Sequence, residues 1–246
     1  MKTLLKLTWV EMKLFVREPI TMIFTLVLPL IFLFVMGGVF GNTPNPKIYS
    51  GYGPMDFYTP AYIELVMASI GTIGLPIHLT GYRERGVFRR LRASALTLPT
   101  IFGAQILVSL LVAVLGGLLI LALALFVYDI HLPSAWGMIT GGFFITLLCF
   151  AGIGLLLGSL LPTTRSAQVV GLLLFVVMMM LSGSGPPREV MTTLMQVIGD
   201  FTPLRHAILV IQDPWLGAGW NNQEFLIVTG IMIFSFGLSL RFFRWE

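Results

Sequence analysis

The chain has 246 residues, of which 57% are hydrophobic and only 11% charged, and its formal net charge is +4. Soluble domains are about a quarter charged, so this composition excludes a water-facing globular fold and indicates an integral membrane protein. The single cysteine, Cys149, excludes an internal disulfide and a cysteine-based metal site.

Residues 1–19 form a basic amphipathic segment ahead of the first apolar run. On a helical wheel the basic side chains share one narrow stripe: Lys2, Lys6, Lys13 and Arg17. Trp9 lies along the edge of this stripe. The pattern is typical of a helix that lies in the cytoplasmic interface of a membrane; an ordinary juxtamembrane anchor and an active mechanical role both fit it. Pro19 predicts a break before the first span.

Six apolar segments approach or meet the length needed to cross a bilayer. A hydrocarbon core about 30 Å thick requires roughly 20 residues of helix. The segments are 20–40, 60–80, 100–127, 138–161, 168–184 and 224–240. Because they do not alternate polar and apolar residues, we expect helices and not a β-barrel. The predicted fold is an all-α integral membrane protein with six transmembrane helices, forming a single domain over 1–246.

Basic residues are distributed unevenly among the connections. With both termini in the cytoplasm, twelve of the fifteen Lys and Arg residues lie inside; the three outside are Lys47, Arg188 and Arg205. The positive-inside rule therefore predicts a multi-pass protein of the cytoplasmic (inner) membrane with cytoplasmic N- and C-termini. The residues before the first span show no pattern of a cleavable signal peptide.

The longest cytoplasmic loop, 82–98, concentrates positive charge. Its five arginines are Arg83, Arg85, Arg89, Arg90 and Arg92. Phe88 and Leu91 are three residues apart and share a helical face among these cations. We expect a short amphipathic helix that docks on a cytoplasmic partner through these two apolar side chains. The alternative is a basic loop that is solvated or lies against anionic lipid.

The stretch between the last two spans, 185–216, is too long and too apolar for a simple loop. Its prolines predict two short helices, at about 187–199 and at about 203–212, the second ending at Asp213–Pro214. Each is too short to cross the bilayer. We expect short re-entrant helices, forming a hairpin on the outer side that acts as an outer gate, with the candidate gate residues Pro186, Pro187, Pro203 and Leu204.

The spans carry few groups that could perform chemistry. The ionisable residues within them are Glu64, near the outer end of the second span, and His78, near its inner end. Glu64 either touches a substrate path or pairs locally. The histidines lack metal-ligand spacing, so we expect no metal site and no catalytic residues. The chain has no Gly-Lys dipeptide and hence no Walker A loop.

Three stretches together resemble the type-2 permeases (ABC-2) of ATP-binding-cassette exporters. Residues 1–19 look like the connecting helix of that family. The sequence YRERGVFRRLRAS (82–94) is similar to its coupling loop, although Ser94-Ala95-Leu96 replaces the Thr-Pro-Leu turn. The sequence LSGSGPPREVMTTLMQVIGDFTPLRHAILVIQD (181–213) is similar to its proline-containing segment before the last span. The resemblance covers essentially the whole chain.

This resemblance implies a coupling helix that sits in a groove of a separate ATPase subunit. The implied coupling residues are Arg83, Glu84, Gly86, Phe88, Arg89, Leu91 and Arg92. It also implies two permease copies, expected to form a homodimer in membrane lipid, and two ATPase copies that bind ATP and Mg. The permease itself would bind no cofactor and no nucleic acid, and it would export a drug-like, lipid or glycan molecule.

Two other function classes stay open from the residues alone. An ion-coupled secondary transporter would place acidic or histidine relays near the midplane and would show an inverted repeat; we detect neither. A membrane-embedded enzyme that modifies lipid would need clustered nucleophile, base or metal ligands, and the sequence offers no such cluster. An inactive scaffold of the same fold is also compatible with the sequence.

Overall fold

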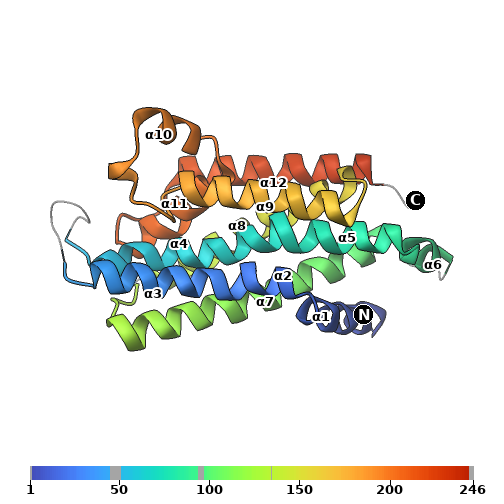
Figure 1. The fold of residues 1–246 in the computed structure, drawn as a ribbon, viewed down its shortest axis with the longest axis horizontal. Coiled ribbons are helices and arrows are strands. Elements are labelled where there is room, and N and C mark those ends of the chain that lie inside the picture. The colour runs from blue at the N-terminus through green and yellow to red at the C-terminus, as the bar shows by residue number, and fades with distance from the viewer. Residues whose placement is uncertain (1, 45–50, 94–96, 134, 244–246) are drawn as a thin grey trace.

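The computed structural model describes residues 2–44, 51–93, 97–133 and 135–243. Within these ranges every regular element is helical, which confirms the predicted all-α class. Figure 1 shows long helices running side by side, with short helices at both ends. We call the end that carries α1 (Lys2–Val16) and α6 (Val87–Ala93) the α6 end. The opposite end, which carries α10 (Thr193–Gly199) and α11 (Pro203–Trp215), is the α10 end.

Six described helical stretches are long and apolar enough to cross a membrane, so the predicted six spans are confirmed. Four are single helices: α7 (Leu98–Tyr128), α8 (Trp136–Leu160), α9 (Thr164–Leu181) and α12 (Asn222–Phe242). The first span joins α2 (Pro19–Met22), η1 (Ile23–Val27) and α3 (Leu28–Phe40). The second, span 2, joins α4 (Pro54–Ser69), η2 (Ile70–Gly74) and α5 (Leu75–Glu84).

Span 2 is longer than the 60–80 expected from hydropathy, since it runs from Pro54 to Glu84. Its side chains are buried almost throughout, which places it at the centre of the bundle. Polar residues such as Asp56 and Thr59 are tolerated near its first end because other helices cover them, whereas Glu84 at its last position is exposed. The predicted fifth span is also displaced: α9 begins at Thr164, where Thr163 and Ser166 cap each other, and ends at Leu181.

Each of the first two spans contains a π-helical turn just ahead of a proline. The turn η1 precedes Pro29, and η2 precedes Pro76. Proline has no N–H to donate and its ring crowds the carbonyl four residues earlier. A widened π turn accommodates both effects without ending the helix.

Backbone contacts through glycine hold η2 between its neighbours. A Cβ atom added to Gly171 of α9 would lie 2.0 Å from the carbonyl oxygen of Thr72. One added to Gly154 of α8 would lie 2.6 Å from the carbonyl oxygen of Gly71. Small residues permit such close helix approach inside a membrane. Span 2 is thus clamped by α8 and α9 at its π turn.

The N-terminal helix and the first span are separated as the sequence predicts. Glu18 has extended backbone (φ −97°, ψ 95°), and Pro19 is the first residue of α2. Leu5 and Trp9 are about 60% exposed on the outer side of α1, and Lys13 Nζ lies 5.1 Å from the centre of the Trp9 ring. The inward side of α1 is partly polar, because Glu11 is buried there.

The hairpin between α9 and α12 differs in detail from the prediction. Pro187 keeps extended backbone, so Arg188–Val190 form only one 3-10 turn and α10 starts at Thr193, not near 187. The second helix passes the expected stop at Pro214 and ends at Trp215. A proline in a last turn removes only one backbone hydrogen bond. The axes of α10 and α11 meet at 84°.

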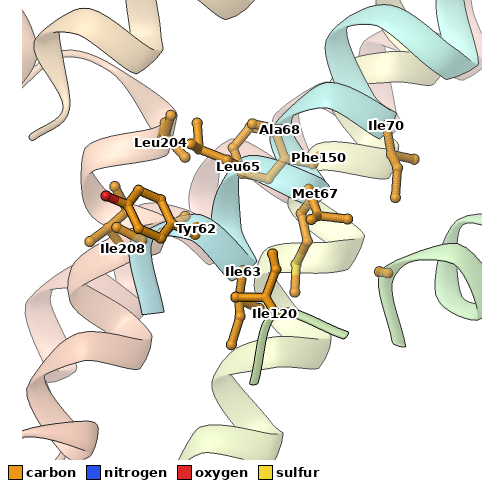
Figure 2. Close-up of a cluster of buried hydrophobic side chains, with 14 of the residues drawn as sticks. Tyr62, Ile63, Leu65, Met67, Ala68, Ile70, Ile120, Phe150, Leu204 and Ile208 are labelled. Carbon is orange, nitrogen blue, oxygen red and sulfur yellow. The ribbon is translucent and has the colours of Figure 1, made fainter. Parts of the chain in front are cut away.

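The helix α11 packs against the middle of the bundle. Leu204 is completely buried and Ile208 is 2% exposed. Figure 2 shows these two side chains directed toward Leu65 and Tyr62 of α4. Inside a membrane such side chains stabilise a helix contact through close van der Waals packing. The hairpin is therefore anchored on span 2.

Candidate functional site

A glycine sets the direction of α6 at the end of span 2. The helix α5 ends at Glu84, and α6 begins at Val87. Between them Gly86 has φ +64°, a left-handed conformation that only glycine adopts without strain. The chain therefore turns sharply there, and α6 leaves the axis of span 2.

Two predicted coupling residues bind the turn between α8 and α9. Arg83 donates from Nη1 to the carbonyl oxygen of Leu161 at 2.8 Å and from Nη2 to that of Gly158. The Glu84 carboxylate accepts a hydrogen bond from Thr164, the first residue of α9. A cation at a helix C-terminus and an anion at an N-terminus both complement the helix dipole. These side chains fix the base of α6 to two neighbouring spans.

Phe88 points into the protein. It is completely buried, with its ring centre 5.7 Å from that of Tyr82 and 5.2 Å from that of Phe243. The expectation that Phe88 is an exposed knob on α6 is therefore wrong: aromatic residues from span 2 and from the end of α12 cover it. The side chains of Leu91 and Arg92 lie outside the part that the structure describes.

The outward side of α6 is basic. Arg85, Arg89 and Arg90 are exposed, and Arg90 Nη2 donates to the carbonyl oxygen of Arg85 at 3.3 Å. Within the described ranges, no acidic side chain forms an ion pair with these three arginines. Guanidinium groups keep their charge and pair with carboxylates through two parallel hydrogen bonds. The α6 surface can therefore receive an acidic partner.

A buried polar contact joins α1 to span 2 near α6. One oxygen of the Glu11 carboxylate contacts Nε2 of His78, and the other accepts from the hydroxyl of Tyr82 at 2.8 Å. Glu11 is only 2% exposed, and a buried carboxylate requires such partners. A polar cavity of about 20 Å³ adjoins this contact and is also lined by Glu18 and Gln105.

Glu11 is a residue that sequence reasoning missed. The wheel places it away from the basic stripe, and nothing in the pattern indicates which helix would receive it. The only signal is a glutamate on the less basic side of an otherwise amphipathic helix. His78 was noted within the span, but its partner lies 67 positions away in the sequence.

The predicted gate residues lie at the α10 end, far from α6 along the bundle (Figure 1). Pro203 is the first residue of α11, and Leu204 is packed against span 2. Pro186 and Pro187 are half-buried in the link that precedes η3 (Arg188–Val190).

Hydrogen bonds tie the hairpin to itself and to two spans. Arg188 Nη2 lies 2.7 Å from the Asp200 carboxylate, and the hydrogen bond from Arg188 is the main reason that the pKa of Asp200 lies below its ordinary value. His206 contacts Glu224 of α12 at 2.5 Å through Nδ1. Gln212 donates to the carbonyl oxygen of Phe57 in α4 at 2.8 Å. The hairpin is thus restrained on both sides.

Glu64 is separate from both groups of residues. It is completely buried, and its Oε1 accepts a hydrogen bond from Thr146 of α8 at 2.9 Å. Oε2 has no hydrogen-bond partner among the described residues. This geometry matches the local pairing that the sequence left open. Within the same ranges, no three His, Cys, Asp or Glu side chains meet in a group that could hold a metal ion.

Comparison with known proteins shows which family model the chain matches and which proteins it resembles. Residues 3–214 match the family model described as ABC-2 type transporter. "Probable multidrug ABC transporter permease YbhR" of Escherichia coli K12 is 28% identical over 196 residues, 76% of this chain and 53% of the relative. "Inner membrane transport permease YhhJ" of the same organism is 31% identical over 198 residues, 75% and 52% of the two chains.

A third relative is ycf38 of Cyanophora paradoxa, whose name describes a transport permease. It is 25% identical over 241 residues, which cover 96% of this chain and 81% of the relative. This chain thus spans about half the length of the two Escherichia coli relatives and about four fifths of ycf38.

Proposed function

The chain belongs to the ABC-2 type transporter family, and on that basis we propose that it is the membrane-spanning permease subunit of an ABC exporter. A separate ATPase subunit binds ATP and Mg and supplies the energy. The permease forms the translocation path and carries no ATP site of its own.

The observation that carries this proposal is the way α6 is fixed at its base. Arg83 and Glu84 bind the turn between α8 and α9, and Phe88 binds the end of α12. A force on the exposed basic side of α6 would therefore reach four spans at once. It would reach α8, α9 and α12 through these contacts, and span 2 because α6 follows span 2 directly in the chain. A helix anchored in this way behaves as a lever, which a solvated basic loop would not.

The connecting helix α1 extends the same lever. Its Glu11 is bonded to His78 and Tyr82, which lie in span 2 close to the start of α6. Movement of α6 would displace α1, and with it the first span that follows Pro19. The exposed Trp9 and Leu5 would keep α1 in the membrane interface during this movement.

The distribution of charge supports an orientation with the α6 end in the cytosol. Exposed basic residues gather at this end: Lys6, Lys13, Arg17, Arg85, Arg89, Arg90, Arg165 and Arg241. The positive-inside rule then places both termini in the cytoplasm and the α10 end outside the inner membrane. The hairpin of α10 and α11 is on the outer side in this arrangement, where it would act as a re-entrant gate.

Transport would require two permease copies and two ATPase copies, with the path between the permeases. We propose a homodimeric membrane core. The word "multidrug" in the name of YbhR supports a drug-like cargo, with lipids and glycans as the other classes. Glu64 would reach a cargo only if α4 and α8 separate at Thr146 during the cycle.

Reversal of the exposed charge on α6 tests the proposal. The variant Arg89→Glu with Arg90→Glu should insert and melt like the wild type, yet lose co-purification with the cognate ATPase and lose ATP-driven transport. Arg241→Glu, exposed at the same end of the bundle, is the matched control and should keep both. Transport driven by an ion gradient in liposomes without any ATPase would instead establish a secondary transporter.

A further inference from the structure

An apolar pocket opens between α7 and α8, toward the α10 end of the bundle. Its volume is about 260 Å³. The floor is formed by Ile63 of α4, Gly117 of α7, Ile139 of α8 and Trp215 of α11, and the apolar side chains among them are less than 10% exposed. Figure 2 shows Ile63 beside Ile120 of α7, one turn from this floor. The pocket is thus built from three spans and the hairpin.

The rim of the pocket is open. Leu118, Trp136 and Phe144 line it and are between 46% and 57% exposed. All three belong to helices long and apolar enough to cross the membrane, so the hydrocarbon core would reach the opening wherever a second permease copy does not cover it. The mobile apolar molecules of that core are lipid chains.

The size of the pocket suits an alkyl chain. A dry apolar cavity of about 150 Å³ accepts benzene, and this pocket is larger. Along α8 it extends from Trp136 to Phe144, which by helix rise is about 12 Å. That length corresponds to a substantial part of one acyl chain within a single leaflet, about 15 Å deep.

One polar atom among the lining residues calls for an acceptor. Trp215 is 5% exposed, and its Nε1 has no hydrogen-bond partner in the described part of the chain. Buried indole N–H groups normally find a partner. Trp136 is the first residue of α8, and tryptophans at the ends of spans are enriched at the headgroup level. The carbonyl oxygen of a lipid ester lies at this depth as well.

We propose that this pocket binds one acyl chain of a phospholipid, with the ester carbonyl accepting a hydrogen bond from Trp215 Nε1. Given the proposed orientation, on which this assignment of leaflet rests, the lipid belongs to the outer leaflet. Trp215 is the last residue of α11, and the other end of α11 carries Leu204 at the packed surface of span 2. The bound lipid therefore supports the gate helix from the membrane side.

Native mass spectrometry of the detergent-purified protein tests this site without any ATPase or transport assay. A phospholipid should remain bound to the wild type. Gly117→Leu should strongly reduce retention, because Gly117 lines the pocket and the added side chain would occupy part of it. Gly230→Leu is the matched control, since a Cβ at Gly230 meets nothing within 4 Å, and it should retain the lipid. Trp215→Phe should weaken retention about five-fold, the value of one hydrogen bond.

A second measurement, on the wild type, tests the site even if the Gly117→Leu variant fails to fold. A phospholipid with a photoactivatable acyl chain should cross-link to Ile139 and Phe143 of the wild type far more than to Ile233 and Phe234, two exposed apolar residues of α12. Equal labelling of the two regions, or equal lipid retention by wild type and Gly117→Leu, would overturn the proposal. Neither result depends on whether the permease couples to an ATPase.

Discussion

The Glu11 carboxylate of α1 contacts the imidazole of His78 in span 2, although the two residues are 67 positions apart. Both side chains are at most 10% exposed. Tyr82, one turn closer to α6, donates to the same carboxylate. The helix α1 and the end of span 2 that leads into α6 are therefore joined through three polar side chains.

Loss of this contact should uncouple α1 from span 2. Glu11→Ala leaves the buried partners of the carboxylate without their acceptor, which costs about 1–3 kcal/mol of unfolding free energy. We expect a lower melting temperature in detergent and ATP hydrolysis that no longer drives transport. Lys6→Ala, on the exposed side of the same helix, should change neither. A Glu11→Ala protein with full transport would show that α1 is only an anchor.

The close contact between α9 and the π turn of span 2 predicts that one methyl group added at Gly171 lowers the stability of the protein. A Cβ at Gly171 would lie 2.0 Å from the carbonyl oxygen of Thr72, so Gly171→Ala must displace α9 or span 2. Overpacking of this kind costs about 1–3 kcal/mol. Thermal melting should show the loss, whereas Gly230→Ala, in open space, should be neutral. Equal melting of the two variants would contradict the close contact.

The orientation can be tested by cysteine labelling. In a Cys149→Ser background, which removes the one native thiol, Leu132→Cys and Ala93→Cys place thiols at exposed positions of the α10 end and the α6 end. An impermeant maleimide added to intact cells should label position 132 and leave position 93 unlabelled until the membrane is permeabilised. Labelling of position 93 but not of position 132 in intact cells would show that the α6 end lies outside the cell, contrary to the proposed orientation.

The Arg188–Asp200 contact predicts a pH dependence at the hairpin. Because the pKa of Asp200 is lowered in the folded protein, chiefly by the hydrogen bond from Arg188, its contribution to stability is present above the ordinary carboxyl pKa. That contribution is lost as the pH falls through the lowered pKa. Since Asp200 is half-exposed, we expect a small effect.

Carbon NMR of labelled aspartate carboxyl groups measures this shift directly. Asp200 should titrate below the ordinary aspartate range in the wild type, and Arg188→Gln should move its pKa upward. Asp200→Asn identifies the signal. An Asp200 pKa that is unchanged by Arg188→Gln would contradict the role given to this hydrogen bond.

The fold class, the six spans and the break at Pro19 follow from hydropathy and proline placement, and the structure bears them out. Element ends were harder to predict. Span 2 begins before its apolar run because neighbouring helices bury polar residues such as Asp56 and Thr59, whereas hydropathy depends only on the residue itself. The stop expected at Pro214 was wrong because proline in a last helical turn costs one bond and leaves the rest intact.

Only part of the candidate site could be predicted from the sequence. Sequence placed Phe88, Arg89 and Arg90 on one short helix correctly, whereas Arg83 belongs to the last turn of α5. A helical wheel cannot say which side of that helix faces the protein. Phe88 is buried because Phe243, far away in the sequence, packs on it. Arg83 caps α8 for the same kind of reason: its acceptors belong to residues about 75 positions later. Such contacts depend on tertiary structure and leave no local pattern.

Site-directed cross-linking tests most directly whether the ATPase subunit binds the basic side of α6. A cysteine at Arg89 in the Cys149→Ser background should form a cross-link with the co-expressed ATPase subunit, and the yield should change when ATP is added. Leu132→Cys, at the α10 end, should form none. If the cysteine at position 89 never cross-links to the ATPase subunit, the ATPase does not bind the basic side of α6.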